Sequence, residues 1–247
     1  MPNKISLGII GASGRLGRSI AALALQDPLL RIGGVFTRPS SHWLHHDLGE
    51  ILGISPTGIT LSADLYTPLD LYIDASLPKA LPDNLQAAIR TKRPLVVGTT
   101  GLSPEDRVLL EETAQHIPLF YAANFSLGMA LLHKLTRETA RLFHPQADID
   151  LIETHHAQKK DAPSGSALAL AETIQDSHPT GKALHLHSIR SGSLIGEHEL
   201  RFNSDEEQLI LSHRVHTRAS FARGALAAAR FLIDQPPGLY TMEHLLS

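Results

Sequence analysis

Short apolar runs alternate with helical patterns along the first half of the chain. The runs that are typical of buried strands cover residues 5–10, 31–36, 71–75, 95–97 and 119–122. After the first run, Leu16, Ile20 and Leu23 recur at the spacing of one helix face. Ser103 and Pro104 precede two acidic residues and mark another helix start, with Ser103 as its N-cap. Strands that alternate with helices predict a parallel α/β sheet, because parallel strands require crossover connections.

The pattern changes after Phe125. A long helical pattern covers residues 127–143, and strand-like runs follow it with one clear helix among them, at residues 166–174. The runs cover residues 149–155, 183–189, 199–202 and 208–215. Strands in succession with little helix predict an antiparallel or mixed sheet, and hence a second domain. Residues 219–232 then return to an alanine-rich helical pattern.

Composition places the chain among ordinary globular proteins. Its 247 residues suffice for one large domain or two modest ones, and 43% hydrophobic with 19% charged residues exclude wholesale disorder. The net charge of −3 and the lack of a Lys/Arg-rich run argue against a nucleic-acid partner. No apolar stretch reaches the roughly 18 residues of a membrane span, so we expect no membrane partner and a cytoplasmic location. The absence of cysteine excludes disulfides, thiolate zinc sites and cysteine nucleophiles.

A glycine-rich turn follows the first predicted strand and opens the first predicted helix. It reads Gly11-Ala-Ser-Gly14-Arg-Leu-Gly17, with Ser13 where the commonest dinucleotide fingerprint has glycine. In a doubly wound fold, Gly11 would allow the tight turn, Gly14 the close approach of a pyrophosphate, and Gly17 the packing of helix on strand. A purely structural turn is the alternative. The position between a strand and a helix favours nucleotide binding.

The end of the second predicted strand commonly selects between cofactors, because an acid there binds the ribose 2′-hydroxyl of NAD. This chain has Thr37-Arg38 instead, and no Asp or Glu lies between residues 31 and 41. An arginine can pair with a 2′-phosphate, whereas a solvated surface arginine is the alternative. The sequence therefore favours NADPH as the cofactor, with NADH as a second candidate. The role of the nearby histidines is open, and we expect a polar loop near the adenine end from His42, His45 and His46.

The most informative segment places cationic side chains ahead of a helix. His155, His156 and Lys159 lead into a Pro-Ser-Gly-Ser turn, where a helix is predicted to start near Gly165 and Ser166. Imidazoliums, an ammonium and the free N–H groups of a helix start all bind anions, so a dicarboxylate would fit. Histidine or lysine could also supply a proton after hydride transfer. Surface histidines at a strand end and a solvated lysine turn are the alternative.

Paired histidines can also bind zinc. Adjacent histidines on a strand, however, point to opposite faces and converge poorly on one ion. We therefore expect no metal at His155 and His156.

Residues 153–167 resemble the His-His-x-x-Lys-x-Asp-Ala-Pro-Ser-Gly-Thr signature of 4-hydroxy-tetrahydrodipicolinate reductases, with Ser166 in place of the threonine. Further segments match in the family's order, at residues 11–17, 97–101, 122–126, and 188–192 with 196–198. The resemblance runs nearly end to end. It implies reduction of 4-hydroxy-tetrahydrodipicolinate to tetrahydrodipicolinate in the diaminopimelate and lysine pathway. The implied chemistry is hydride transfer from NAD(P)H to a cyclic imine, followed by protonation.

The resemblance also implies the fold and the domains. The fold class would be α/β, a Rossmann-like doubly wound parallel sheet with an inserted α+β substrate domain built on a mixed sheet. The dinucleotide-binding domain would comprise residues 1–126 and 219–247. The domain for substrate binding and oligomerisation would comprise residues 127–218 and form a homotetramer.

Site residues follow from the same resemblance. His155 would be the principal acid/base residue and Lys159 the proton donor. The small dicarboxylate substrate would be bound by His156, Lys159, Gly165 and Ser166. The cofactor would be bound by Gly11, Ala12, Ser13, Gly14, Arg15, Leu16, Arg38, Gly98, Thr99, Thr100, Ala122, Ala123, Asn124 and Phe125. Arg218 is a further candidate anion partner or cofactor contact, with a structural salt bridge as the alternative.

Two other functions compete with this one. The first is another two-domain NADP-dependent reductase, such as a semialdehyde or sugar dehydrogenase, although the lack of cysteine argues against a thiohemiacetal mechanism. The second is a dinucleotide sensor without catalysis, which would not need His155 and Lys159 beside an anion-binding helix start.

Two departures from the family affect the details. Thr37 stands where some members have an acid and use both cofactors, and the stretch at residues 175–183 is short.

Overall fold

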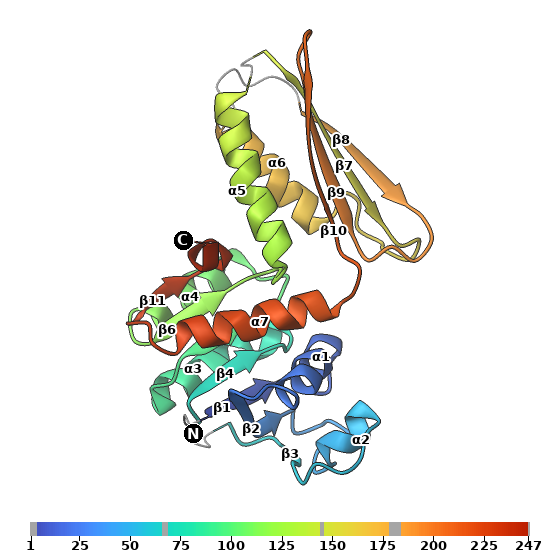
Figure 1. Ribbon diagram of the computed structural model, residues 1–247. Helices are drawn as coiled ribbons and strands as arrows, with labels where there is room; N and C mark the ends of the chain where they lie inside the picture. Colours follow the sequence, from blue (N-terminus) through green and yellow to red (C-terminus); the bar gives the residue numbers. More distant parts are fainter. Residues whose placement is uncertain (1–3, 66–68, 144–145, 178–183, 247) are drawn as a thin grey trace. The chain divides into compact units, whose positions relative to one another are not determined.

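The computed structural model describes residues 4–65, 69–143, 146–177 and 184–246. The chain divides into two compact units. Unit 1 comprises Met1–Phe125 and Phe221–Ser247, and unit 2 comprises Ser126–Ser220. Each unit is built on its own sheet (Figure 1). The predicted α/β class, with a parallel sheet and a separate mixed sheet, is confirmed.

The sheet of unit 1 is parallel throughout the described residues. Its strands are β1 (Ile5–Ile10), β2 (Leu30–Phe36), β3 (Leu61–Ser62), β4 (Leu71–Asp74), β5 (Leu95–Val97), β6 (Pro118–Tyr121) and β11 (Gly238–Tyr240). They lie in the order β11-β6-β5-β4-β1-β2-β3. The part from β3 to β6 has the strand order of the doubly wound dinucleotide fold, in which ligands bind beyond the carboxyl ends of the strands.

Helices connect these strands. They are α1 (Arg15–Ala24), α2 (Leu48–Leu52), α3 (Leu81–Thr91), α4 (Pro104–Ala114) and α7 (Ala219–Leu232), with 3₁₀ turns η1 (Pro78–Ala80) and η2 (Met242–Leu246). The start of α4 is as predicted. The Asp106 N–H donates to Ser103 Oγ at 3.2 Å and the Ser103 N–H donates to the Asp106 carboxylate at 2.9 Å, which is a capping box. The sequence pattern did not predict α2, α3, β3 or β11.

Unit 2 is a mixed sheet with two helices on one face (Figure 1). Its elements are α5 (Leu127–Leu142), β7 (Asp148–His155), α6 (Gly165–Ser177), β8 (Leu184–Arg190), β9 (Glu197–Asn203) and β10 (Gln208–Arg214). The strand order is β10-β9-β7-β8, in which β7 and β8 are parallel and the other pairs antiparallel. Leu132 of α5 and Leu170 of α6 pack with Leu151 and Leu200 of the sheet in one apolar core.

The elements of unit 2 lie close to the predicted ones, with small differences at their ends. The helix predicted for residues 166–174 begins at Gly165 and continues to Ser177. The strand predicted from residue 183 is observed from Leu184. Residues 178–183 lie outside the described part of the chain, so the conformation of the 175–183 loop is not described beyond Ser177.

Candidate functional site

The glycine-rich turn lies between β1 and α1, at the carboxyl edge of the unit 1 sheet. Gly11 has a φ of +76°, and a Cβ on it would lie 2.6 Å from the carbonyl oxygen of Ala75, so only glycine fits. A Cβ on Gly17 would lie 2.3 Å from the carbonyl oxygen of Gly11, because α1 packs directly on the turn. Gly14 is the N-cap of α1 and provides no side-chain cap. The N–H groups of the first turn are therefore available to an anion such as a pyrophosphate.

The other residues predicted to bind the cofactor at this edge differ in exposure. Ala12 is buried, Ser13 and Leu16 are half-buried, and Arg15 is exposed. Arg38 follows β2 and is also exposed. Arg15 and Arg38 are therefore the charged side chains of this set that a ligand in solution could reach.

The loop after β2 carries the three histidines expected near the adenine end. His42, His45 and His46 are all exposed. Between them, Trp43 lies with its ring centroid 5.5 Å from the guanidinium carbon of Arg18 on α1. The rings of His42 and His46 lie 4.7 Å and 5.5 Å from the Trp43 ring. The Arg18–Trp43 contact thus holds this loop beside the helix that follows the glycine-rich turn.

Two further segments lie at the carboxyl edge of the same sheet. Residues 98–100 follow β5 and residues 122–125 follow β6, and these strands are paired neighbours. Thr99 and Phe125 are buried, whereas Thr100 is exposed. The structure therefore brings the predicted nicotinamide segments together, with some of their side chains supporting the turns and others facing solvent.

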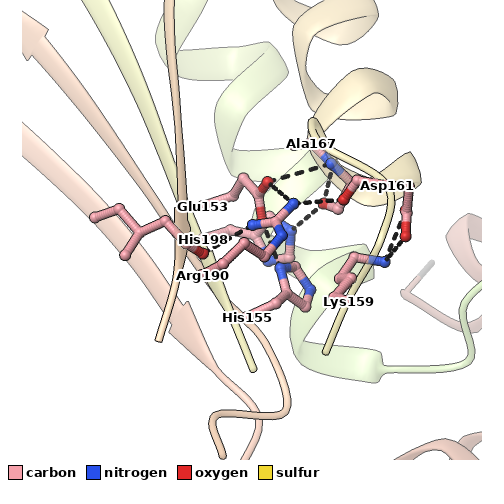
Figure 2. A network of polar contacts seen from close by, with 9 residues as sticks. Glu153, His155, Lys159, Asp161, Ala167, Arg190 and His198 are labelled. Carbon is pink, nitrogen blue, oxygen red and sulfur yellow. Dashed lines mark hydrogen bonds and ion pairs between the residues drawn. The ribbon is translucent and has the colours of Figure 1, made fainter. Parts of the chain in front are cut away.

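A second group of polar side chains lies on the helix-covered face of the unit 2 sheet (Figure 2). Glu153 and His155 are two residues apart on β7 and so share this face. Nδ1 of His155 is hydrogen-bonded to Oε2 of Glu153. Arg190 of β8 donates from Nη2 to Oε1 of Glu153 at 2.6 Å, and the Ser164 N–H donates to the same oxygen at 3.3 Å. One buried carboxylate thus joins two strands and the start of α6.

The charges of this network influence one another. Burial alone raises the pKa of the Glu153 carboxyl. Hydrogen bonds from Arg190, Ser188 and His155 more than offset burial, and this pKa ends below its ordinary value. Burial lowers the pKa of His155, and the Glu153 carboxylate opposes that effect. Glu153 is therefore an anion at neutral pH, and His155 releases its proton more readily than a free imidazole does.

His198 of β9 completes the network. It is the register partner of Glu153, and its ring lies 5.3 Å from the His155 ring at an interplanar angle of 80°. Its Nε2 lies 3.3 Å from Oγ of Ser164, and this Oγ accepts the Ala167 N–H at 3.2 Å. Burial lowers the pKa of His198 to about 4, with a smaller contribution from the charge of His155. His198 is therefore uncharged at neutral pH.

Lys159 lies close enough to His155 for its charge to lower the pKa of that imidazole. Its Nζ donates to both carboxylate oxygens of Asp161, at 2.9 Å and 2.7 Å (Figure 2). Lys159 thus has an anionic partner on the protein, Asp161. An anionic ligand that binds Lys159 would share or replace this partner.

The remaining residues predicted to bind substrate lie around the start of α6 and the end of β7. His156 and Ser166 are half-buried. A Cβ on Gly165 would meet no atom within 4 Å, so the space beside this helix start is open. Arg218 is exposed, one residue before α7. In the described part of the chain, no group of three or more His, Asp or Glu side chains could hold a metal ion.

Nearly the whole chain matches one protein family. Residues 5–125 match the family pattern described as "Dihydrodipicolinate reductase, N-terminus", and residues 128–246 match "Dihydrodipicolinate reductase, C-terminus". The chain belongs to the dihydrodipicolinate reductase family. The resemblance seen in the sequence motifs is thereby confirmed.

Curated relatives of this chain match over nearly their full length. The 4-hydroxy-tetrahydrodipicolinate reductase of Pseudoalteromonas atlantica is 39% identical over 266 residues, which cover 99% of this chain and 98% of the relative. That of Acinetobacter baumannii is 36% identical over 261 residues, covering 97% and 95%. Among solved structures, the dipicolinate-bound dihydrodipicolinate reductase from Paenisporosarcina sp. TG-14 has a TM-score of 0.78 at 23% identity, covering 98% of this chain and 99% of that one. This last likeness shows a shared fold.

Sequence reasoning assigned no role to three members of the buried network, Glu153, Arg190 and His198. The alternation of side chains along a strand does place Glu153 on the same face as His155. The contacts of Arg190 and His198 depend on the register of β8 and β9 against β7, which no local pattern reveals. Among the described residues, the helices lack the combination of length and apolar character needed to cross a bilayer.

Proposed function

We propose that this reductase converts 4-hydroxy-tetrahydrodipicolinate to tetrahydrodipicolinate with NAD(P)H, in the diaminopimelate pathway to lysine. The observation that carries the proposal is the end-to-end match to relatives named for this activity, at 39% identity across 99% of the chain. The two units offer the two kinds of site that the reaction needs. One has a glycine-rich turn suited to a dinucleotide, and the other has acid/base side chains beside cations and a helix start.

The bound nicotinamide supplies a hydride to a ring carbon of the cyclic imine that forms once water is lost. We assign residues 11–16 to the pyrophosphate, because the bare N-terminus of α1 offers N–H groups there. We assign residues 98–100 and 122–125 to the nicotinamide end, because they share the carboxyl edge of paired strands.

The side chains of unit 2 would hold the substrate and manage the proton. His155 is the principal acid/base residue and Lys159 the proton donor in this proposal. His156, Lys159 and the helix start at Gly165 and Ser166 bind the two carboxylates. Cations and helix N-termini bind such groups, and fixing both carboxylates orients the ring for hydride transfer. Lys159 would exchange or share its Asp161 partner when the substrate carboxylate arrives.

NADPH is the proposed preferred cofactor, with NADH as a second one. The exposed Arg38 at the end of β2 supports this choice, since a guanidinium pairs well with a 2′-phosphate. Thr37, immediately before it, offers no carboxylate to the 2′-hydroxyl of NAD.

We also propose a cytoplasmic homotetramer that forms through the unit 2 sheet. Ile189 and Ile210 support this, because they are 46% and 47% exposed on strands β8 and β10. Thr154 and Arg201, their register partners, alternate with buried residues along β7 and β9 and so lie on the face away from α5 and α6. Register partners share a face, so Ile189 and Ile210 lie on that face too. Light scattering coupled to gel filtration measures the mass; a monomer at micromolar concentration contradicts the tetramer.

The function is tested by following NADPH oxidation at 340 nm with freshly generated 4-hydroxy-tetrahydrodipicolinate. We expect turnover by the wild type. His155→Gln should lower kcat by about 10²-fold to 10⁴-fold, the usual contribution of a general acid/base, with little change in the Kd for NADPH. NADPH binding without turnover would indicate a dinucleotide sensor. Equal losses in kcat and cofactor affinity would contradict the role of His155.

A further inference from the structure

The carboxylate of Glu153 is held from several sides at once. It is fully buried, at 0% exposure. Oε1 accepts from Nη2 of Arg190 at 2.6 Å and from the Ser164 N–H at 3.3 Å, while Oε2 meets Nδ1 of His155 (Figure 2). Both oxygens are therefore occupied, and the direction in which Glu153 presents Oε2 to His155 is set by donors on β8 and at the start of α6.

Arg190 is itself held in place. Its Nη2 also donates to the carbonyl oxygen of Asp161 at 2.6 Å, and its Nη1 donates to the carbonyl oxygen of Ile189 at 2.8 Å. A guanidinium with these contacts keeps a fixed positive charge beside Glu153. The carboxylate consequently stays ionised despite its burial, as the direction of its pKa shift also indicates.

An ionised carboxylate can only accept hydrogen bonds. Nδ1 of His155 must therefore carry a proton whenever it bonds to Glu153, in the charged and in the neutral imidazole alike. Proton loss from the ring is then confined to Nε2. In metal sites and hydrolases, a carboxylate likewise accepts from one ring nitrogen of a histidine, and this leaves the other nitrogen to bind the metal or transfer a proton.

Nε2 of His155 faces a position without a side chain. A Cβ on Gly196 would lie 3.0 Å from Nε2 and 3.3 Å from Cδ2 of the His155 ring. Glycine at this position thus leaves Nε2 uncovered on that side. The His198 ring lies 5.3 Å from the His155 ring in a T-shaped arrangement and, being uncharged, does not repel an imidazolium there.

We propose that Glu153, held by Arg190 and the Ser164 N–H, is a positioning residue that keeps the proton on Nδ1 of His155 and so makes Nε2 the nitrogen that exchanges a proton with the substrate. This inference rests on the proposed acid/base function of His155. Its physical core, the tautomer of a buried histidine, can be measured without any turnover.

The first test is nuclear magnetic resonance of the ¹⁵N-histidine-labelled wild type without substrate, at a pH where His155 is neutral. Chemical shifts of the ring nitrogens report which one carries the proton, and His155→Gln assigns the signals. We expect the Nδ1–H form in the wild type. In Glu153→Gln, the new amide can donate to Nδ1, so the Nε2–H form should appear. If the neutral His155 of the wild type is protonated on Nε2, the proposal is wrong. This measurement is made on the wild type, and the one variant that must also fold is His155→Gln, which assigns the signals.

The second test is the pH profile of kcat/KM for Glu153→Gln. The charged or titratable groups that face His155 are Glu153 on β7, Arg190 on β8, His198 on β9 and Lys159 in the loop after β7. Of these, Glu153 favours the imidazolium, and Lys159 and Arg190 disfavour it. Loss of the carboxylate should therefore move the limb that reports deprotonation of His155 to lower pH. At the pH optimum, kcat should fall by about 10²-fold to 10⁴-fold, while the Kd for NADPH stays within twofold of the wild type.

A matched control is Glu138→Gln, which removes another arginine-paired glutamate of unit 2, on the surface of α5 and 3.9 Å from Arg141. It should leave kcat, the pH profile and the histidine signals unchanged. A purely structural role of Glu153 predicts a different result, namely a lower melting temperature and less active protein with the pH limb in its wild-type place. That result contradicts the inference. If the wild type shows no turnover, the proposed function fails, but the tautomer measurement still decides the role of Glu153.

Discussion

His198 offers a direct measure of how far its site is closed to water. Its side chain lies on the covered face of the unit 2 sheet at 3% exposure. Burial lowers its pKa from 6.5 to about 4 in the folded protein. The unfolded chain therefore binds this proton more readily than the folded protein does. Stability is complete above about pH 6.5 and falls as the pH drops from there toward the folded pKa.

The size of this effect follows from the two pKa values. One pKa unit corresponds to about 1.4 kcal/mol, so the full loss below both values is about 3 kcal/mol. At pH 5.0 the unfolded histidine is almost fully protonated and the folded one is about one-tenth protonated. Integration between pH 7.5 and 5.0 then gives a loss of about 2 kcal/mol from His198 alone. This is a substantial share of the 5–15 kcal/mol that stabilises a typical domain.

The perturbation is His198→Gln, which keeps an amide near Ser164 but cannot titrate. Urea unfolding of both proteins is followed at pH 7.5 and 5.0 by far-ultraviolet circular dichroism. Tryptophan fluorescence is unsuitable because the single tryptophan, Trp43, lies in unit 1. The pKa values of His155 and His213 are also lowered by burial, and both residues are present in the two proteins. Because their charges also act on His198, only the part of their titration that does not depend on His198 cancels in the comparison.

The expected result is a pH-dependent loss that is about 2 kcal/mol larger in the wild type than in His198→Gln. Any pH-independent cost of the substitution drops out of this double difference. Equal losses in the two proteins would mean that His198 titrates normally. In that case the site would be wet rather than closed, and the account of an uncharged His198 beside His155 would be wrong.

Three further predictions concern the glycine-rich turn, the cofactor and the proposed acid/base residue His155. Gly17→Ala should lower the free energy of unfolding by about 2 kcal/mol in urea titrations, because its Cβ would lie 2.3 Å from the carbonyl oxygen of Gly11; an unchanged midpoint would contradict this packing. Arg38→Ala should raise KM for NADPH by about tenfold or more, as loss of a charge-assisted hydrogen bond does, and leave KM for NADH unchanged; equal changes for the two cofactors would refute the 2′-phosphate contact. Gly196→Ala should displace the His155 ring and lower kcat with the Kd for NADPH retained, and a wild-type kcat would show that Nε2 does not need this space.

Much of the fold follows from local patterns. The capping box involves Ser103 and Asp106, which belong to four consecutive residues, and α4 starts where that pattern predicts. The pattern at residues 219–232 matches α7 in full. By contrast, β3 and β11 contain two and three residues and exist because β2 and β6 offer them partners. Strands this short have too few residues to show a period, so only the neighbouring strand defines them.

The site divides in the same way. His155, His156 and Lys159 lie within one short segment, and their anion-binding role was predicted from residue type. Arg190 lies 37 positions after Glu153 and reaches it only because β7 and β8 are parallel neighbours. Lys159 and Asp161 are two positions apart, but their ion pair depends on the conformation of the loop after β7. Residue identity therefore predicts which groups can react, whereas strand register decides which of them are held.

The polar residues around His155 do not add to stability, and this favours a role for them in the reaction. A buried ion pair such as Glu153–Arg190 loses in desolvation much of what it gains in attraction, and apolar residues of similar volume are often as stable. His198 adds a further cost, since it makes the unit less stable in acid. The adjoining part of the same face, around Leu151, Leu200 and Phe202, is apolar and shows what this sheet can accommodate. The polar groups of β7, β8 and β9 are concentrated around the His155 ring. A histidine that serves as an acid/base residue with a fixed tautomer needs such polar neighbours.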